Sequence, residues 1–129
     1  MSTITRFEDL EIWQLAKQQA SEIFILINRE PFNRDFELKN QLNAASGSVM
    51  DNIAEGFDRS GNKEFSNFLL IAKGSKAETR SQLYRALDRN HITSDIFTEM
   101  KIKNETLGNK IMAFLKYLKT SEFKGQRYK

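Results

Sequence analysis

The stretch Asn52-Ile-Ala-Glu-Gly-Phe-Asp-Arg59 stands where one amphipathic helix is expected to end and the next to begin. The apolar residues at 53 and 54 continue a helical face. A glycine two residues later can close the last turn, because glycine readily takes the left-handed conformation that ends helices. We therefore predict a helix junction that is structural, not catalytic, with a positive φ at its glycine. Its residues are Asn52, Ile53, Ala54, Glu55, Gly56 and Phe57, the last folding back on the final turn.

Both sides of this junction carry apolar residues every three or four positions, the spacing of one helix face. The pattern predicts one helix over 35–55 and another over 62–89. Each has a glycine near its middle, Gly47 or Gly74. Because mid-helix glycine costs about 1 kcal/mol against alanine, we expect close approach of a neighbouring helix at these points. The alternative at Gly47 is a tolerated weak spot.

Two further helices are predicted, over 9–28 and 94–120. Pro31 falls in the break after the first, because proline inside a helix loses a hydrogen bond. The last helix carries a heptad-like apolar seam interrupted by Asn104, which we expect near a bundle end. Short loops favour antiparallel neighbours. The pattern predicts an all-α, up-down-up-down antiparallel four-helix bundle over 1–120, with a basic C-terminal tail over 121–129.

The composition excludes several classes of protein. The chain has 129 residues, 40% hydrophobic and 29% charged, which suits one domain with one core. It contains no cysteine, which excludes disulfides, a thiolate nucleophile and a cysteine-based zinc site. No apolar run approaches the roughly 20 residues of a membrane span, and the N-terminus lacks the apolar core of a secretory signal. We expect a cytoplasmic protein with no membrane partner.

Positive charge gathers in two places. Residues 109–129 hold six basic side chains and one acidic one, which gives a net charge of +5 there against +3 for the whole chain. A basic stripe also steps by three and four along the predicted third helix. Either group could meet phosphates, or form a solvated face or an oligomer contact. The candidate nucleic-acid-binding residues are Arg59, Lys63, Lys73, Lys76, Arg80, Lys116, Lys119, Lys124, Arg127 and Lys129.

The sequence offers no reactive constellation. His91 is the single histidine and is expected in a turn without a special role. Glu55 and Glu78 could pair as carboxylates, but the repeated Glu-x-x-His of metal-binding bundles is missing. We expect Asn52 and Glu55 to bond backbone groups or Arg59. No enzyme activity, cofactor or metal is predicted.

A dispersed set of residues resembles one known family. The segments that carry the resemblance are Phe7-Glu-Asp-Leu10, Asn52 to Gly56, Lys63-Glu-Phe65 and Gly74-Ser75. They resemble the bacterial four-helix bundle proteins of the 23S rRNA intervening-sequence family. These are similar to the accessory protein of diversity-generating retroelements, a pentameric barrel that works with a reverse transcriptase and nucleic acid. One departure is that Asn43 and Ala44 stand where the family usually carries arginine.

The resemblance implies a bundle that assembles into a ring-like homo-oligomer, with five subunits as the best guess. Together with the basic residues, it predicts a non-enzymatic helical oligomerisation module that binds RNA or DNA, or a nucleic-acid enzyme. The alternative is a structural or protein-interaction ring without nucleic-acid affinity. The aromatic residues could offer stacking surfaces for bases, but their helical spacing favours the core or a subunit interface.

Overall fold

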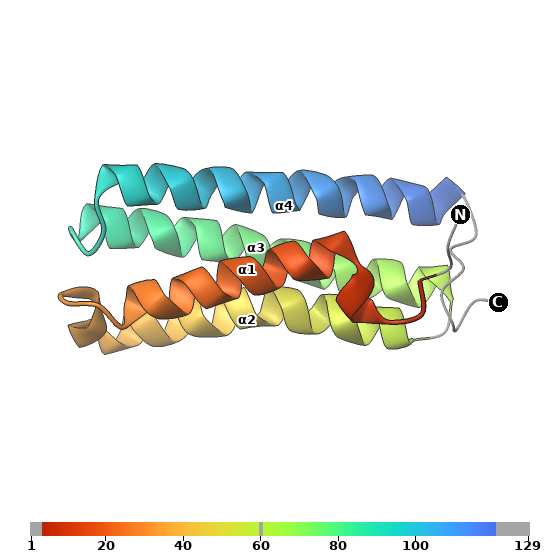
Figure 1. Ribbon diagram of the computed structural model, residues 1–129, viewed down its shortest axis with the longest axis horizontal. Coiled ribbons are helices and arrows are strands. Elements are labelled where there is room, and N and C mark those ends of the chain that lie inside the picture. The colour runs from red at the N-terminus through yellow and green to blue at the C-terminus, as the bar shows by residue number, and fades with distance from the viewer. Residues whose placement is uncertain (1–3, 60, 121–129) are drawn as a thin grey trace.

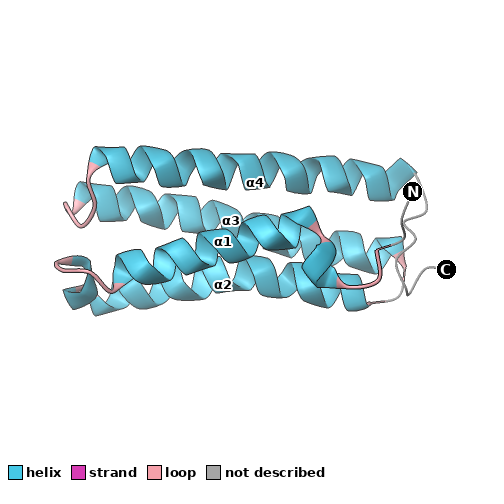
Figure 2. Cartoon of the chain, viewed as in Figure 1, coloured by secondary structure: helices cyan, strands magenta, loops and turns pink. Residues whose placement is uncertain are grey.

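The protein is a four-helix bundle, as the sequence predicts. The computed structural model describes residues 4–59 and 61–120, and no strand occurs in that part of the chain. Consecutive helices lie side by side along one axis and run in opposite directions (Figure 1), and short turns join them (Figure 2). The elements are a 3-10 turn η1 (Phe7–Asp9), α1 (Glu11–Ile27), a 3-10 turn η2 (Phe32–Arg34), α2 (Phe36–Asp58), α3 (Asn62–Asp88) and α4 (Ser94–Thr120). The predicted tail, 121–129, lies outside the described residues.

The helices are neighbours in the order α1, α2, α3, α4 around the bundle, and of the four adjacent pairs α1 and α4 pack least closely. The predicted apolar stripes form the core. In α2, for example, Leu38, Leu42, Val49 and Ile53 are fully buried. The 3.6-residue period of apolar residues therefore sufficed to predict which face of α2 turns inward.

The prediction that the helix ends at Gly56 with a positive φ is wrong. Helix α2 continues to Asp58, and the positive φ falls at Gly61, the residue before α3. A Cβ atom at Gly56 would lie 2.7 Å from the Cβ of Phe68 and 3.0 Å from the Cδ1 of Phe65. Gly56 therefore lets α2 and α3 meet. Continuing the helix also buries Phe57 against the core, where its ring stands 6.0 Å from that of Phe65.

The predicted close approach does not occur at the two mid-helix glycines themselves, but it is confirmed for the small residues beside them. A Cβ atom at Gly47 or Gly74 would meet nothing within 4 Å. The weak-spot alternative fits Gly47. Besides Gly56, α2 and α3 meet at two small neighbours of these glycines, Ser48 and Ser75, whose hydroxyls are 2.9 Å apart.

Asn104 lies in the core, not near a bundle end as predicted. Its side chain is fully buried, and its Nδ2 donates to Gln19 Oε1 at 2.7 Å and to the backbone oxygen of Lys76 at 3.1 Å. The buried Gln19 of α1 supplies a polar partner, while Gln19 Nε2 and Asn104 Oδ1 find none among the described residues. One amide thus links α1, α3 and α4.

His91 has a role that the sequence did not indicate. Its Nε2 lies 2.9 Å from Asp35 Oδ2, and its ring stacks on Phe32 at 5.0 Å. Asp35 also caps α2 by accepting from the Leu38 amide, and it pairs with Arg89 at 2.8 Å. The bond to His91, followed by that to Arg89, lowers the pKa of Asp35 to about 2. This cluster ties the α1–α2 connection to the α3–α4 turn.

A first prediction separates the two kinds of glycine. Gly56→Ala should lower the free energy of unfolding by about 1–3 kcal/mol, because the added methyl group overpacks the contact with α3. Gly47→Ala should raise it by about 0.5–1 kcal/mol, because alanine suits a helix interior and has room there. Urea unfolding followed by circular dichroism measures both. Equal effects of the two substitutions would contradict this assignment.

A second prediction concerns pH. The pKa of Asp35 is lowered on folding, so its ionised form stabilises the fold above its unfolded value of about 3.9, and this contribution is lost as pH falls toward 2. Asp35→Ala should therefore lose about 1–2 kcal/mol at neutral pH, the value of an N-cap. The difference from the parent protein should shrink from about pH 4 downward. Asp51→Ala, at an exposed position of α2, should show no such trend in thermal melts.

Candidate nucleic-acid interface

The junction residues bond within the bundle, as predicted. Asn52 Nδ2 donates to the backbone oxygen of Ser48 at 2.8 Å and to its hydroxyl at 3.0 Å. Glu55 pairs with Arg59 at 2.7 Å. Across residues 4–59 and 61–120, no three histidine or carboxylate side chains gather as metal ligands. These bonds hold the end of α2 through contacts between its own neighbouring turns.

The basic stripe of α3 turns toward α4. Lys76 extends over Gly108, where an added Cβ atom would lie 2.6 Å from the Lys76 Nζ. One turn later, Arg80 Nη1 lies 3.2 Å from Glu105 Oε2. Lys73, one turn earlier, is exposed, and its positive charge contributes to lowering the pKa of Lys76. The spacing of three and four along a helix places all three on this side.

The matching side of α4 is also basic. Its residues recur every three or four positions from Lys101 through Glu105 and Gly108 to Lys116 and Lys119. We define the α3–α4 seam as this row of α4, with Met112 included, and the facing row of α3. It comprises Lys73, Lys76, Arg80, Tyr84, Lys101, Glu105, Gly108, Met112, Lys116 and Lys119.

Folding therefore joins two groups of candidates that lie far apart in the sequence. By the spacing of three and four from Gly108, Lys116 and Lys119 fall on the same side of α4 that meets the third-helix stripe. Lys101, which the sequence analysis missed, belongs to the same row, and its ammonium lies 6.0 Å from the centroid of the Tyr84 ring. The four-residue spacing from Lys101 to Glu105 can be read from the sequence. It indicates a shared site only once α4 is known to face the Lys76 side of α3.

The seam holds six cations and one carboxylate, Glu105, which gives it a net charge of +5. Partial burial lowers the pKa of Lys76, and the neighbouring charges of Arg80 and Lys73 lower it further, while Glu105 acts in the opposite direction. These three cations of the seam thus repel one another. A bound anion would relieve that repulsion.

The remaining candidates lie elsewhere. Arg59 is off the seam: it pairs with Glu55 and lies over the ring of Phe68 at 5.0 Å, on the side of α3 that meets α2. Lys63 is exposed in the first turn of α3, at the end where Asn62 Nδ2 donates to the Leu118 backbone oxygen at 3.1 Å. It thus shares that end of the bundle with Lys119. Three candidates lie outside the described residues: Lys124, Arg127 and Lys129.

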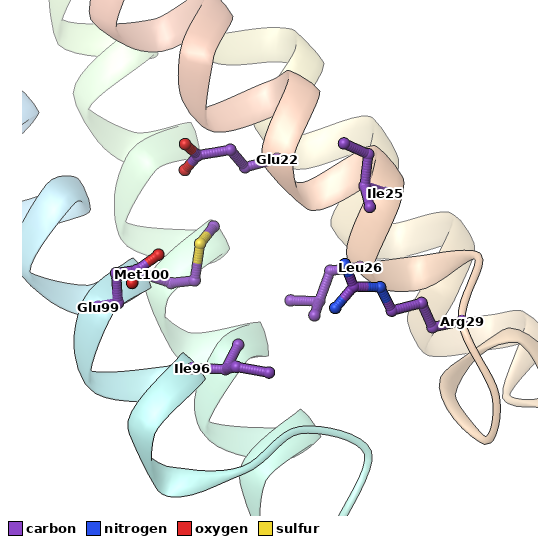
Figure 3. A pocket seen from close by; sticks show the side chains of 7 residues that line it. All are labelled: Glu22, Ile25, Leu26, Arg29, Ile96, Glu99 and Met100. Carbon is purple, nitrogen blue, oxygen red and sulfur yellow. The ribbon is translucent and has the colours of Figure 1, made fainter.

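A second surface feature is the α1–α4 groove, a hollow of about 200 Å³ where these helices diverge. Figure 3 shows Glu22 and Leu26 of α1 on one side of the groove and Glu99 and Met100 of α4 on the other, with Arg29 at one edge. The charges along this groove are balanced. Lys103 pairs with Glu22 at 2.9 Å, and farther along Lys110 pairs with Glu11 at 3.2 Å. The groove therefore lacks the excess of positive charge that the seam carries.

The fold and this charged face define a small helical bundle with one basic side. None of the helices in the described part of the chain carries an apolar stretch that could cross a membrane. The chain belongs to the family described as 23S rRNA-intervening sequence protein, whose profile matches residues 8–113. The resemblance expected from the sequence is thus confirmed.

Comparison with solved structures supports the fold. A crystal structure from Bacteroides thetaiotaomicron, of a protein of unknown function from the S23 ribosomal protein family, is similar with a TM-score of 0.75. The two chains are 18% identical, and the match covers 81% of this chain and 98% of the other. A search of curated proteins finds no match. The likeness to the retroelement accessory protein stays a prediction.

Proposed function

We propose that this protein is a non-enzymatic, oligomeric helical module that binds nucleic acid through the α3–α4 seam. The observation that carries the proposal is the gathering of six cations and a single carboxylate on one face. In α4 the row from Lys101 to Lys119 extends roughly 27 Å at 1.5 Å per residue. A surface of that length can meet several phosphates of a strand.

The missing family arginines do not weaken this proposal. Asn43 and Ala44 are exposed on α2, and α2 takes no part in the seam. Their replacement removes positive charge from another side of the bundle. Because the seam contacts would be to phosphates, binding should tolerate changes of base sequence and weaken as salt rises.

Self-association is supported by apolar side chains that lie off the seam. The most exposed is Phe36, with 71% of its surface accessible, followed by Phe24 at 59%, Ile102 at 57% and Ile25 at 56%. Burying such side chains against another copy would be favourable by the hydrophobic effect. We propose a homo-oligomer of five subunits, the number that the resemblance implies. The same exposure favours the second candidate, a protein-interaction ring without nucleic-acid affinity.

A third prediction tests the seam by charge removal. The double variant Lys73→Gln/Lys116→Gln should bind an oligonucleotide about tenfold more weakly, and its salt slope should fall by about 1.4–1.8, because two phosphate contacts are lost. Fluorescence anisotropy across a salt series measures both quantities. The matched control is Lys17→Gln/Lys39→Gln, on α1 and α2, which removes the same charge away from the seam.

Equal losses in both double variants would contradict a role for the seam. Failure of the parent protein to bind even at low salt would favour the interaction ring. The contribution predicted for Lys124, Arg127 and Lys129 is tested separately by deleting residues 121–129.

A fourth prediction concerns assembly. Multi-angle light scattering should return five times the chain mass of 15.0 kDa across micromolar concentrations. Phe36→Ser should shift the distribution toward smaller species because it removes apolar contact area. Met112→Ser, at an exposed apolar position of the seam, is the control and should leave the mass unchanged. A monomer mass for the parent protein throughout would remove the ring.

A further inference from the structure

We propose that the α3–α4 seam takes single-stranded nucleic acid in preference to duplex, with the Tyr84 ring as the platform on which one base stacks. This inference rests on the proposed function, because it names the class of nucleic acid that the same seam would bind. It is carried by the one aromatic side chain of the seam, which lies among its cations.

Tyr84 combines exposure with support. Its side chain is 44% accessible, yet its ring stands 4.6 Å from the ring of Phe97, which is buried on α4. Contact with a buried ring restricts how Tyr84 can turn. An exposed ring held in one orientation loses little conformational freedom when a base stacks on it.

Cations flank the ring from both helices. Arg80 lies one turn before Tyr84 on α3, and Lys101 places its ammonium 6.0 Å from the ring centroid. This distance is within the range of a cation–π contact, which shows that the π face of Tyr84 is reachable. A stacking base would displace the ammonium from the ring, and the Lys101 side chain is long enough to move to a neighbouring phosphate.

The geometry favours a single strand for a simple reason. In a duplex each base already stacks on its neighbours, so its face is not available to a side chain on a protein surface. A single strand can turn a base outward onto an aromatic ring while its phosphates follow the cations. Proteins that bind single strands commonly combine a basic surface with such stacking platforms.

The experiment compares a single-stranded oligonucleotide with a duplex of equal length, as RNA and as DNA, by fluorescence anisotropy on the full chain. The parent protein should bind the single strand more tightly. Tyr84→Leu should weaken single-strand binding about tenfold and leave duplex binding little changed, because a stacked base is lost. Tyr84→Phe should bind as the parent does. Tyr117→Leu changes a comparably exposed tyrosine, 40% accessible and off the seam, and should also match the parent.

A second readout keeps the test independent of stability. A 2-aminopurine base placed in the strand should be quenched on binding to the parent protein and to Tyr84→Phe, but not on binding to Tyr84→Leu. Duplex binding as tight as single-strand binding, or equal behaviour of Tyr84→Leu and Tyr117→Leu, would overturn this inference while leaving the seam in place. Failure of the proposed function itself would give a different result, because the parent protein would then bind neither the single strand nor the duplex at low salt.

Discussion

The buried amide of Asn104 fixes how three of the four helices lie against one another. It donates at once to Gln19 of α1 and to the Lys76 carbonyl of α3, and it is fully shielded from water. A slip of α4 by one turn, about 5.4 Å, would leave these polar groups unpaired in the core. The same register sets Lys76 over Gly108 and Arg80 beside Glu105. The arrangement of the seam thus depends on one buried hydrogen-bonded group.

The helices were predictable from the sequence, because periodic burial determines them. The last helix, 94–120, was predicted at its observed bounds, and the buried stripe of α2 agrees residue by residue. The C-terminal end of α2 was not predicted correctly. A glycine such as Gly56 can end a helix by its backbone or admit a neighbour by its missing Cβ, and only the position of Phe68 on α3 distinguishes the two. The prediction for Asn104 failed for a similar reason, because its hydrogen-bond partner Gln19 lies on another helix.

The candidate site was predictable only in parts. Local spacing identified the stripe of α3 and the basic end of α4, but not that they share a face. It also could not separate Arg59, which is drawn toward Glu55 and Phe68, from cations that remain on the seam. Lys101 and Tyr84 acquire their significance from the contact between α3 and α4. These are non-local facts, and the sequence pattern of one helix does not contain them.

The distribution of charge between the two sides of α4 argues for a role beyond folding. Along the α1–α4 groove, lysines pair with carboxylates of α1. Along the seam, Lys73, Lys76 and Arg80 follow one another with one opposing carboxylate. Each pair of like charges at this helical spacing destabilises the helix by a few tenths of a kcal/mol. An exposed ion pair of opposite charges stabilises the fold by little more than that. A sequence shaped by stability alone would gain from alternating the signs here, as it does on the other side. The crowded cations cost the folded chain a little and suit the binding of an anionic strand.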